Sequence, residues 1–240
     1  MRILILAALA GLSGSAAQAV NLVANGDFDL STNGVGQLKT GAGGTIVTNW
    51  TKTGNLAWLL SPATDDVGVP YGGSMFSIWG PSNGSNNGLT ASPTGGNYLA
   101  ADGGGNFAAG VKQTINGLTA GHSYNVEFDH AAGQQHGFTG ATTEAWRVSL
   151  GTQNFTTVPQ LTASHGFSPW LHQKFVFTAT SASAVLEFFA VGTPAGVPPI
   201  SFLDNVTLTA VPEPATWALM LGGFAMVGFA ARRRRSSVAA

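Results

Sequence analysis

Apolar and polar residues alternate with a period of two through the middle of the chain. In Ser123–His130, the side chains of Tyr124, Val126 and Phe128 would share one face of a strand, and the polar residues between them would share the other. Similar alternation predicts strands over residues 111–115, 144–150, 172–179 and 184–190. Trp146 falls in an apolar phase, which predicts a core position. Helical periodicity is absent, so the pattern predicts an all-β fold, an antiparallel sandwich with one solvated face per sheet.

One segment breaks this alternation. From Gly80 to Asn97, fourteen of the eighteen residues are Gly, Ser, Asn or Pro. Such a composition predicts a long flexible loop that buries little apolar surface. Its first five residues match G-x-S-x-G, but a nucleophile elbow requires a strand before the serine and a helix after it. We therefore attribute the match to chance.

Both ends of the chain differ from the middle. Residues 1–19 combine a positive start, an apolar stretch and an A-x-A cleavage site, which predicts a secretory signal peptide removed before Val20. Residues 215–231 are uncharged, and as a helix they would rise about 25 Å, at the short end of what spans a bilayer. Four arginines, Arg232, Arg233, Arg234 and Arg235, would hold that end in the cytoplasm. The sequence therefore predicts an exported body, residues 20–210, followed by one transmembrane helix.

The tripeptide Pro212-Glu213-Pro214 lies directly before this apolar run, and the arginines lie directly after it. The order resembles the PEP-CTERM sorting signal of Gram-negative bacteria, here over residues 211–235. The resemblance implies export by the secretion machinery and transient anchoring in the inner membrane. It also implies removal of the tail by exosortase, a membrane cysteine transpeptidase, and delivery to the cell surface or extracellular matrix. The alternative is an ordinary C-terminal membrane anchor with a proline-rich stalk.

The charge of the body excludes one class of partner. Arg2 and Arg232–Arg235 account for five of the ten basic residues and Glu213 for one of the eleven acids, so the body has five basic and ten acidic residues. No basic patch is left to displace counterions from phosphate, which argues against nucleic acid. The chain also has no cysteine. Disulfides, thiol catalysis and cysteine-ligated zinc are therefore excluded.

Acidic residues gather in the first and last segments of the body. Asp27 and Asp29 share a phase near the start, whereas Asp204 falls in the apolar phase of Ile200 and Phe202. A carboxylate in an apolar series is costly unless it is paired, protonated or bound to a metal. If the terminal segments lie side by side, two or three carboxylates meet, and Ca²⁺ is the cation that best fits such oxygen ligands.

The same segments resemble a known class of domain. The stretches NLVANGDFD, NWT, GVKQTINGLTAGHSYNVEFD and ISFLDNVTL are similar to jelly-roll, galactose-binding-like modules, which include many carbohydrate-binding modules. The resemblance implies a jelly-roll β-sandwich with a structural calcium between an acid of the first strand, Asp27 or Asp29, and Asp204 of the last. The alternative is that Asp204 faces solvent at a bulge while Asp27 caps a turn.

Aromatic residues near loops are the candidates for ligand contact. Sugar rings stack on flat aromatic faces, and Trp58, Tyr71 and Trp79 lie near loops or strand ends. The alternative is that these side chains pack in the core or beneath loops. Scattered histidines without a further ligand do not predict zinc. Glu127 and Asp129 share the polar face of one strand, so we interpret them as solvated rather than as an acid–base pair.

Three functions remain open at this point. The leading hypothesis is a non-enzymatic surface or matrix protein, sorted by exosortase, with a calcium-stabilised sandwich for adhesion or glycan contact. Its low charge and many amides and hydroxyls favour a neutral polysaccharide as ligand. A hydrolase acting on exopolysaccharide would need two carboxylates in one cleft, and no such pair stands out. A structural matrix component without a specific ligand is the third hypothesis.

Overall fold

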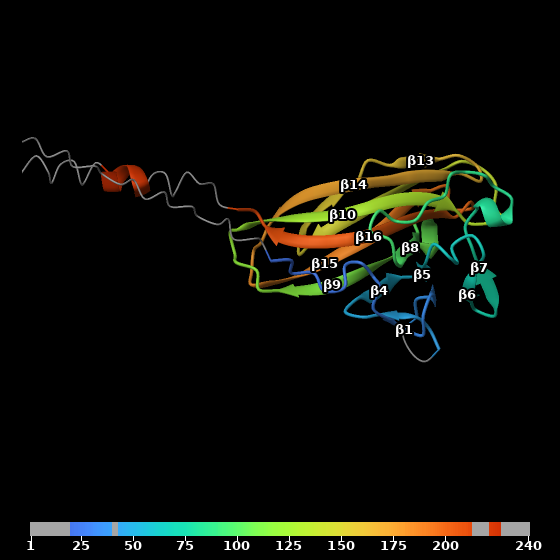
Figure 1. Cartoon of the computed structure of the whole chain (residues 1–240), viewed down its shortest axis with the longest axis horizontal. Helices are drawn as coiled ribbons and strands as arrows, with labels where there is room; N and C mark the ends of the chain where they lie inside the picture. The colour runs from blue at the N-terminus through green and yellow to red at the C-terminus, as the bar shows by residue number, and fades with distance from the viewer. Residues whose placement is uncertain (1–19, 40–42, 213–220, 227–240) are drawn as a thin grey trace, which may run out of the picture.

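The computed structural model describes residues 20–39, 43–212 and 221–226, and two antiparallel sheets make up most of them (Figure 1). Sheet I has the strand order β14 (Phe167–Thr178), β10 (Ser123–Gln134), β16 (Pro199–Ala210), β8 (Tyr98–Asp102), β5 (Ala57–Leu60) and β2 (Gly36–Gln37). Sheet II has the order β12 (Gln153–Thr156), β11 (Thr142–Leu150), β15 (Ser183–Thr193), β9 (Ala109–Asn116) and β4 (Thr51–Gly54), with β13 (Gln160–Thr162) paired to β11. Short pairs join β1 (Ser31–Thr32) to β3 (Ile46–Val47) and β6 (Val69–Tyr71) to β7 (Ser74–Phe76), and two 3-10 turns are η1 (Pro81–Asn83) and η2 (Gly105–Phe107).

The main core lies between the two sheets. Tyr124, Val126 and Phe128 of β10 point into it, as does Trp146 of β11, so the inward phases predicted from the sequence are confirmed. The five strands predicted by alternation lie in β9, β10, β11, β14 and β15. Consecutive strands cross between the sheets, from β8 in sheet I to β9 in sheet II and back to β10. The predicted antiparallel sandwich is confirmed.

A second core covers the outer face of sheet I. Trp58 of β5, Phe76 of β7 and Phe202 of β16 are fully buried there, and the Trp58 and Phe76 rings stack with centroids 3.7 Å apart. Segment 61–97 supplies part of this cover, and Leu89 of the Gly/Ser/Asn-rich stretch packs against it. Leu89 is half-buried and is the one apolar side chain of Gly80–Asn97 in this core, so the expectation that the stretch buries little apolar surface is confirmed. The stretch, which we call the strap, lies on apolar residues of its neighbours.

A bulge in β16 explains where Asp204 points. Asn205 has a φ of 53°, and the pairing of β16 with β10 shifts register at this position. The extra residue inverts the alternation, so that Phe202 belongs to the second core whereas Val206 and Leu208 belong to the first. The regular strand assumed from the sequence would have placed all three on one face. Asp204 is fully buried on the strap side of the sheet.

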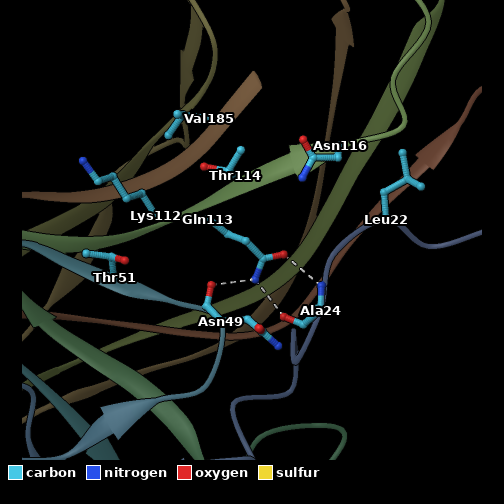
Figure 2. A pocket seen from close by; sticks show the side chains of 9 residues that line it. All are labelled: Leu22, Ala24, Asn49, Thr51, Lys112, Gln113, Thr114, Asn116 and Val185. Carbon is cyan, nitrogen blue, oxygen red and sulfur yellow. Dashed lines mark hydrogen bonds between the residues drawn. The ribbon is translucent and has the colours of Figure 1, made fainter. Parts of the chain in front are cut away.

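The N-terminal segment is hydrogen-bonded to both sheets. The Leu22 amide donates to the Leu208 carbonyl at 2.9 Å, and the Val206 amide donates to the Gly26 carbonyl at 2.9 Å. Gly26 is required at this contact because a Cβ there would lie 1.9 Å from the Val206 oxygen. On the sheet II side, the Gln113 side-chain amide accepts from the Ala24 N–H and donates to its carbonyl, both at 2.9 Å (Figure 2). These bonds close the sandwich without a disulfide.

The two chain ends leave the sandwich together. Leu22 pairs with Leu208, and the Val211 amide donates to the Ser123 carbonyl at the first residue of β10. At about 3.4 Å per residue, the twelve residues of β10 extend roughly 37 Å from there to Gln134. Loops and η1 lie at that far end (Figure 1). We call the Ser123 end the tether end and the Gln134 end the distal tip.

Several predicted features lie outside the described residues. They are the signal peptide, Glu213 and Pro214 of the sorting tripeptide, the greater part of the predicted helix over 215–231, and Arg232–Arg235. Residues 221–226 are helical. Within the portion of the chain that the structure describes, no helix is both long enough and apolar enough to cross a membrane.

Candidate functional site

Trp79 lies at the distal tip. Its backbone amide donates to the carbonyl of Gln134, and its indole N–H donates to the Phe138 carbonyl at 2.9 Å. The indole ring stacks on the His165 ring with centroids 3.9 Å apart and meets the His136 ring edge-on at 4.4 Å. The Trp79 side chain remains half-buried. An aromatic ring with fixed orientation and partial exposure is suited to stack against a ligand.

Most loops around Trp79 are uncharged, although the Asp66 carboxylate accepts from the Ser82 amide at 2.7 Å beside them. Segments 77–97, 103–108, 133–143, 157–166 and 192–199 contain no Asp, Glu, Lys or Arg. Two exposed aromatic side chains, Phe107 of η2 (49% exposed) and Phe138 (39%), belong to the same set of loops. The turns of the tether end, residues 117–122, 151–152 and 179–182, contain no Phe, Tyr or Trp. The loops of the distal tip therefore carry aromatic side chains, whereas the turns of the tether end carry none.

The other two aromatic residues predicted to contact a ligand, Trp58 and Tyr71, lie away from Trp79 and its loops. Trp58 is fully buried in the second core, so it presents no face to a ligand. Tyr71 is half-buried and meets the Trp58 ring edge-on at 5.7 Å. It lines a pocket of about 410 Å³ with Asn33, Gln37, Lys39 and other residues of the β2 and β6–β7 region. Of the three residues, Trp79 has the surroundings that best suit a sugar.

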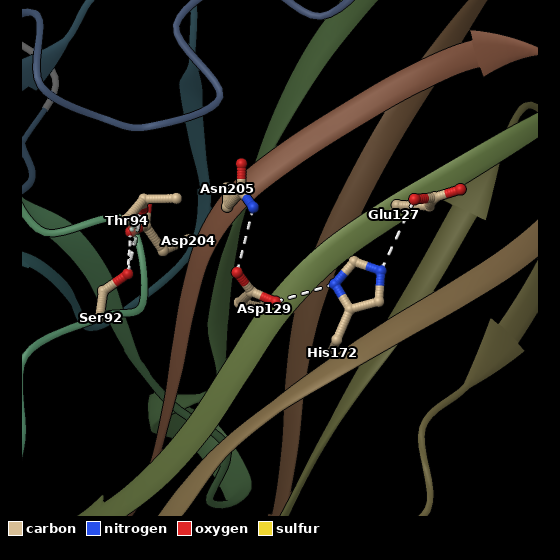
Figure 3. A network of polar contacts seen from close by, with 7 residues as sticks. All are labelled: Ser92, Thr94, Glu127, Asp129, His172, Asp204 and Asn205. Atoms are coloured by element: carbon tan, nitrogen blue, oxygen red, sulfur yellow. Dashed lines mark hydrogen bonds and ion pairs between the residues drawn. The ribbon is translucent and has the colours of Figure 1, made fainter.

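Asp204 and the strap form a buried polar site (Figure 3). One carboxylate oxygen of Asp204 accepts hydrogen bonds from the hydroxyls of Ser92 and Thr94, the latter at 2.8 Å, whereas the other oxygen is buried without a hydrogen-bond partner. Burial is the main reason that the pKa of Asp204 is raised to about 6; the hydrogen bonds from Ser92 and Thr94 oppose the rise, and the nearby Asp29 carboxylate adds a small part of it. Asp29 in turn accepts from the backbone amide of Asn97 at 2.7 Å. Two carboxylates and two hydroxyls thus converge where the strap ends.

The predicted trio of metal ligands is only partly assembled. Asp29 and Asp204 are close enough to interact, but Asp27 is exposed and lines a separate pocket of about 320 Å³ beside Asn205. Across the described parts of the chain, no group of three or more His, Asp or Glu side chains is placed to hold a metal ion. A cation at Asp204 would therefore need hydroxyl and carbonyl oxygens besides the two carboxylates.

Glu127 and Asp129 occupy the outer face of β10, but their acceptors are engaged (Figure 3). His172 of β14 contacts Asp129 through Nδ1 at 2.9 Å and Glu127 through Nε2 at 3.6 Å. Lys174 pairs with Glu127 at 2.9 Å, and Asn205 donates to Asp129 at 3.1 Å. Asp129 is buried, so our expectation of a solvated side chain was wrong for this residue. The bulge at Asn205 and the His172 ring cover it.

Another buried carboxyl, that of Glu144, lies inside the sandwich. Glu144 of β11 is 1% exposed, and one of its oxygens accepts from the Thr162 hydroxyl at 2.7 Å, while the other has no hydrogen-bond partner. The Thr142 hydroxyl is likewise buried without a partner. Burial raises the pKa of Glu144 to about 7, against the opposing effect of the Thr142 and Thr162 hydroxyls. A proton on Glu144 would let it donate to Thr142 and satisfy both groups.

A polar groove of about 560 Å³ lies at the edge of sheet II, where β4 begins and β9 extends past it (Figure 2). Gln113 forms part of it, but its amide is committed to Ala24 and to the Asn49 carbonyl. Thr51, Thr114 and Asn116 supply further polar groups, and the groove is lined by no aromatic side chain. It offers no stacking surface for a sugar ring.

Sequence reasoning missed several members of these sites. Ser92 and Thr94 lie in a stretch whose composition indicated only a flexible loop, and His165 and His136 carry no motif. No signal in the sequence places them, because long-range pairing brings them to Asp204 and Trp79. His165 adopts a φ of 60°, which a glycine or asparagine adopts more readily. The ring of this residue stacks on Trp79.

Comparison with known families identifies the C-terminal segment. Residues 210–235 match the model of the PEP-CTERM protein-sorting motif, so the chain carries this motif as the sequence predicted. The motif implies an exported protein that is anchored through its C-terminus and processed by exosortase. No curated protein matches the sequence.

Comparison with solved structures finds carbohydrate-binding modules. The chain is similar to TmCBM61 in complex with beta-1,4-galactotriose, with a TM-score of 0.42 and 16% identity over 80% of this chain and 100% of that one. It is similar to the CBM22-1 xylan-binding domain of Xyn10C from Paenibacillus barcinonensis, with a TM-score of 0.42 and 8% identity over 83% and 99% of the two chains. A CBM4 structure has a TM-score of 0.33 and 16% identity over 78% and 99%.

Proposed function

We propose that this chain is a non-enzymatic surface or matrix protein that binds a neutral polysaccharide at its distal tip. It is delivered through its sorting motif, and exosortase then removes the C-terminal tail. The single observation that carries the proposal is that the tether end and the distal tip lie at opposite ends of the sandwich. The N-terminal segment and the end of β16 leave one end of the sandwich, and Trp79 lies at the other, roughly 37 Å away.

The chemistry of the tip supports a neutral ligand. Trp79 supplies a ring held by His165 and by the Phe138 carbonyl, and Phe107 and Phe138 add exposed apolar surface. The surrounding loops carry mainly amides and hydroxyls, and the Asp66 carboxylate beside them accepts from the Ser82 amide. Such a surface gains from ring stacking and hydrogen bonds, while long-range electrostatic steering contributes little. Binding should therefore be weak and insensitive to salt.

The Asp204 site supports a structural calcium ion. Asp204 is fully buried with one carboxylate oxygen unpartnered, and the second carboxylate nearby, Asp29, is negative as well. A divalent cation would neutralise both charges and occupy the unpartnered oxygen. Asp204 and Asp29 would hold it together with the hydroxyls of Ser92 and Thr94. In this proposal the ion stabilises the sandwich and takes no part in catalysis.

The test compares Trp79 variants of the full chain in mild detergent. Loss of one stacking contact of about 1.4 kcal/mol weakens binding about tenfold, so Trp79→Ala should lower affinity for a neutral polysaccharide by that factor. Trp79→Phe should retain part of the affinity. Phe155→Ala removes an exposed aromatic ring (42%) from β12, which is not one of the tip loops, and serves as the control. Isothermal titration and thermal melts are run on each variant.

Two results would overturn the proposal. The first is a Trp79→Ala variant with unchanged affinity and a lowered melting temperature, because Trp79 would then be only a packing residue. The second is release of reducing sugar from the polysaccharide by the wild-type chain, which would identify a hydrolase. A wild-type chain that binds none of a panel of neutral polysaccharides would favour the purely structural alternative.

A further inference from the structure

The strap joins the two sites described above. It begins at Gly80, directly after Trp79 of the distal tip, and ends at Asn97, whose amide donates to Asp29. Between these ends, the Trp170 indole donates to the Thr90 carbonyl at 3.2 Å, and Leu89 packs on the second core. The strap is thus bonded along its length to the sheet beneath it.

At the tip, Asn87 links the backbones of Trp79 and His165, whose rings stack. Its side-chain amide donates to the carbonyl of Trp79 at 2.8 Å and to the carbonyl of His165 at 3.0 Å, while its oxygen accepts from the Leu89 amide at 3.1 Å. The Ser85 hydroxyl also donates to the His165 carbonyl, at 2.7 Å. The position of the Trp79 ring relative to His165 therefore depends on where the strap lies.

At the other end, the strap is held by one buried carboxylate, Asp204, and one exposed carboxylate, Asp29. Ser92 and Thr94 donate to Asp204, and the Asn97 amide donates to Asp29. Thr94 is exposed, so the site is reached from solvent at this residue. Any ion that binds the two carboxylates also acts on the residues through which the strap is attached.

Direct electrostatics cannot link the two sites. Asp204 pairs with Asp129 and Trp79 bonds to Gln134, five residues further along β10, which corresponds to roughly 17 Å. This exceeds the Debye length of about 8 Å at physiological ionic strength. At the tip, the Asp66 carboxylate is already engaged by the Ser82 amide at 2.7 Å. A link must therefore pass through bonded contacts.

We infer that the strap couples the Asp204 site to the Trp79 tip, so that a divalent cation at Asp204 and Asp29 fixes the Trp79–His165 stack and raises the affinity of the tip for its ligand. Asn87 is the positioning residue that transmits the effect. The inference rests on the function proposed above and assigns its regulation. Coupling between binding sites is reciprocal, so ligand at the tip raises the affinity for the cation by the same factor.

The first experiment needs no glycan. The full chain in detergent is titrated with Ca²⁺ alone while tryptophan fluorescence is recorded, and the Trp79→Phe variant is subtracted to isolate the signal of Trp79. We expect this signal to change as Ca²⁺ binds. Asn87→Asp keeps the size of the side chain but removes the donor, so it should abolish the change while calorimetry still detects Ca²⁺ binding. Asn86→Asp, at an exposed neighbouring position, controls for the added charge.

The second experiment measures affinity for a neutral polysaccharide in Ca²⁺ and in chelator. We expect a loss of at least fivefold on chelation for wild type and for Asn86→Asp, and no dependence on Ca²⁺ for Asn87→Asp. The inference is overturned if Ca²⁺ does not bind, if the Trp79 signal ignores bound Ca²⁺, or if Asn87→Asp responds as wild type does. A Trp79 signal that responds to Ca²⁺ in a chain that binds no polysaccharide would refute the proposed function but leave the coupling intact.

Discussion

Replacing Glu144 by glutamine should change how stability depends on pH. The carboxyl is 1% exposed inside the sandwich, and one of its oxygens accepts a hydrogen bond from the Thr162 hydroxyl. Burial raises its pKa from 4.5 to about 7. Glutamine has nearly the same shape, its oxygen can accept from Thr162, and its amide can donate to the unpartnered Thr142 hydroxyl.

The magnitude follows from the two pKa values. The folded chain holds the Glu144 proton up to about pH 7, whereas the unfolded chain releases it near pH 4.5. The unfolded state therefore gains stability as the pH rises between these values, and the folded state loses about 1.4 kcal/mol per pH unit relative to it. The contribution of protonated Glu144 to the free energy of unfolding is fully present below pH 4.5 and is lost by pH 7, a total of about 3 kcal/mol. Glu144→Gln should match wild type in acid and exceed it by up to that amount above pH 7.

Urea unfolding of the full chain in detergent at several values between pH 4 and pH 8 provides the assay. The difference in unfolding free energy between variant and wild type is plotted against pH, which removes the contributions of Asp65, Asp102 and Asp204, whose pKa values burial also raises. Glu187→Gln, on the half-exposed outer face of sheet II, controls for the loss of one negative charge. A difference that stays flat across this range, or that grows toward acid, would refute the reasoning.

Three further predictions concern the ends of the body and its processing. Asp204→Ala should lower the melting temperature far more than Asp27→Ala, because Asp204 is buried and Asp27 is exposed. Only Asp204→Ala should remove the effect of chelator on the melting temperature, and equal effects of the two variants in thermal scans would contradict the metal assignment. Gly26→Ala should destabilise the body by several kcal/mol in urea, since the new Cβ would lie 1.9 Å from the Val206 oxygen, and a change within about 0.5 kcal/mol would refute the contact. Intact-mass measurement of the surface-exposed form should show a chain that lacks residues 1–19 and the arginine cluster, and a mass that still includes Arg232–Arg235 would count against processing.

The strands and their inward faces could be predicted from the sequence because each depends on local alternation. Tyr124, Val126 and Phe128 needed only a period of two, and the sorting motif needed only the order of its three parts. The expectation for Asp204 was partly right: it is buried, but it faces the strap rather than the main core. The cause is one residue, Asn205, whose left-handed backbone inverts the alternation, and asparagine adopts that conformation too commonly for the sequence to mark it.

The strap shows why the rest of the site could not be predicted. Its glycines and serines are typical of mobile loops, and their composition says nothing about partners more than seventy residues away. The Asn87 amide reaches His165, and Ser92 reaches Asp204. Trp58 was misjudged for a related reason: its strand is short, and only the fold reveals that segment 61–97 covers its outer face. Contacts between segments that are distant in the sequence leave no periodic pattern from which they could be predicted.

The central position of β16 has a mechanical consequence. This strand is hydrogen-bonded to β10 on one side and to β8 on the other, and it runs from the distal end of the sandwich directly into the tail. A pulling force between the far loops and the tail would act along the axis of β16, so the bonds on both sides would be loaded together in shear. These hydrogen bonds would have to break almost simultaneously, whereas a strand pulled from the edge of a sheet separates one hydrogen bond at a time. The same connection that presents the tip away from its anchor would therefore also resist being torn from it.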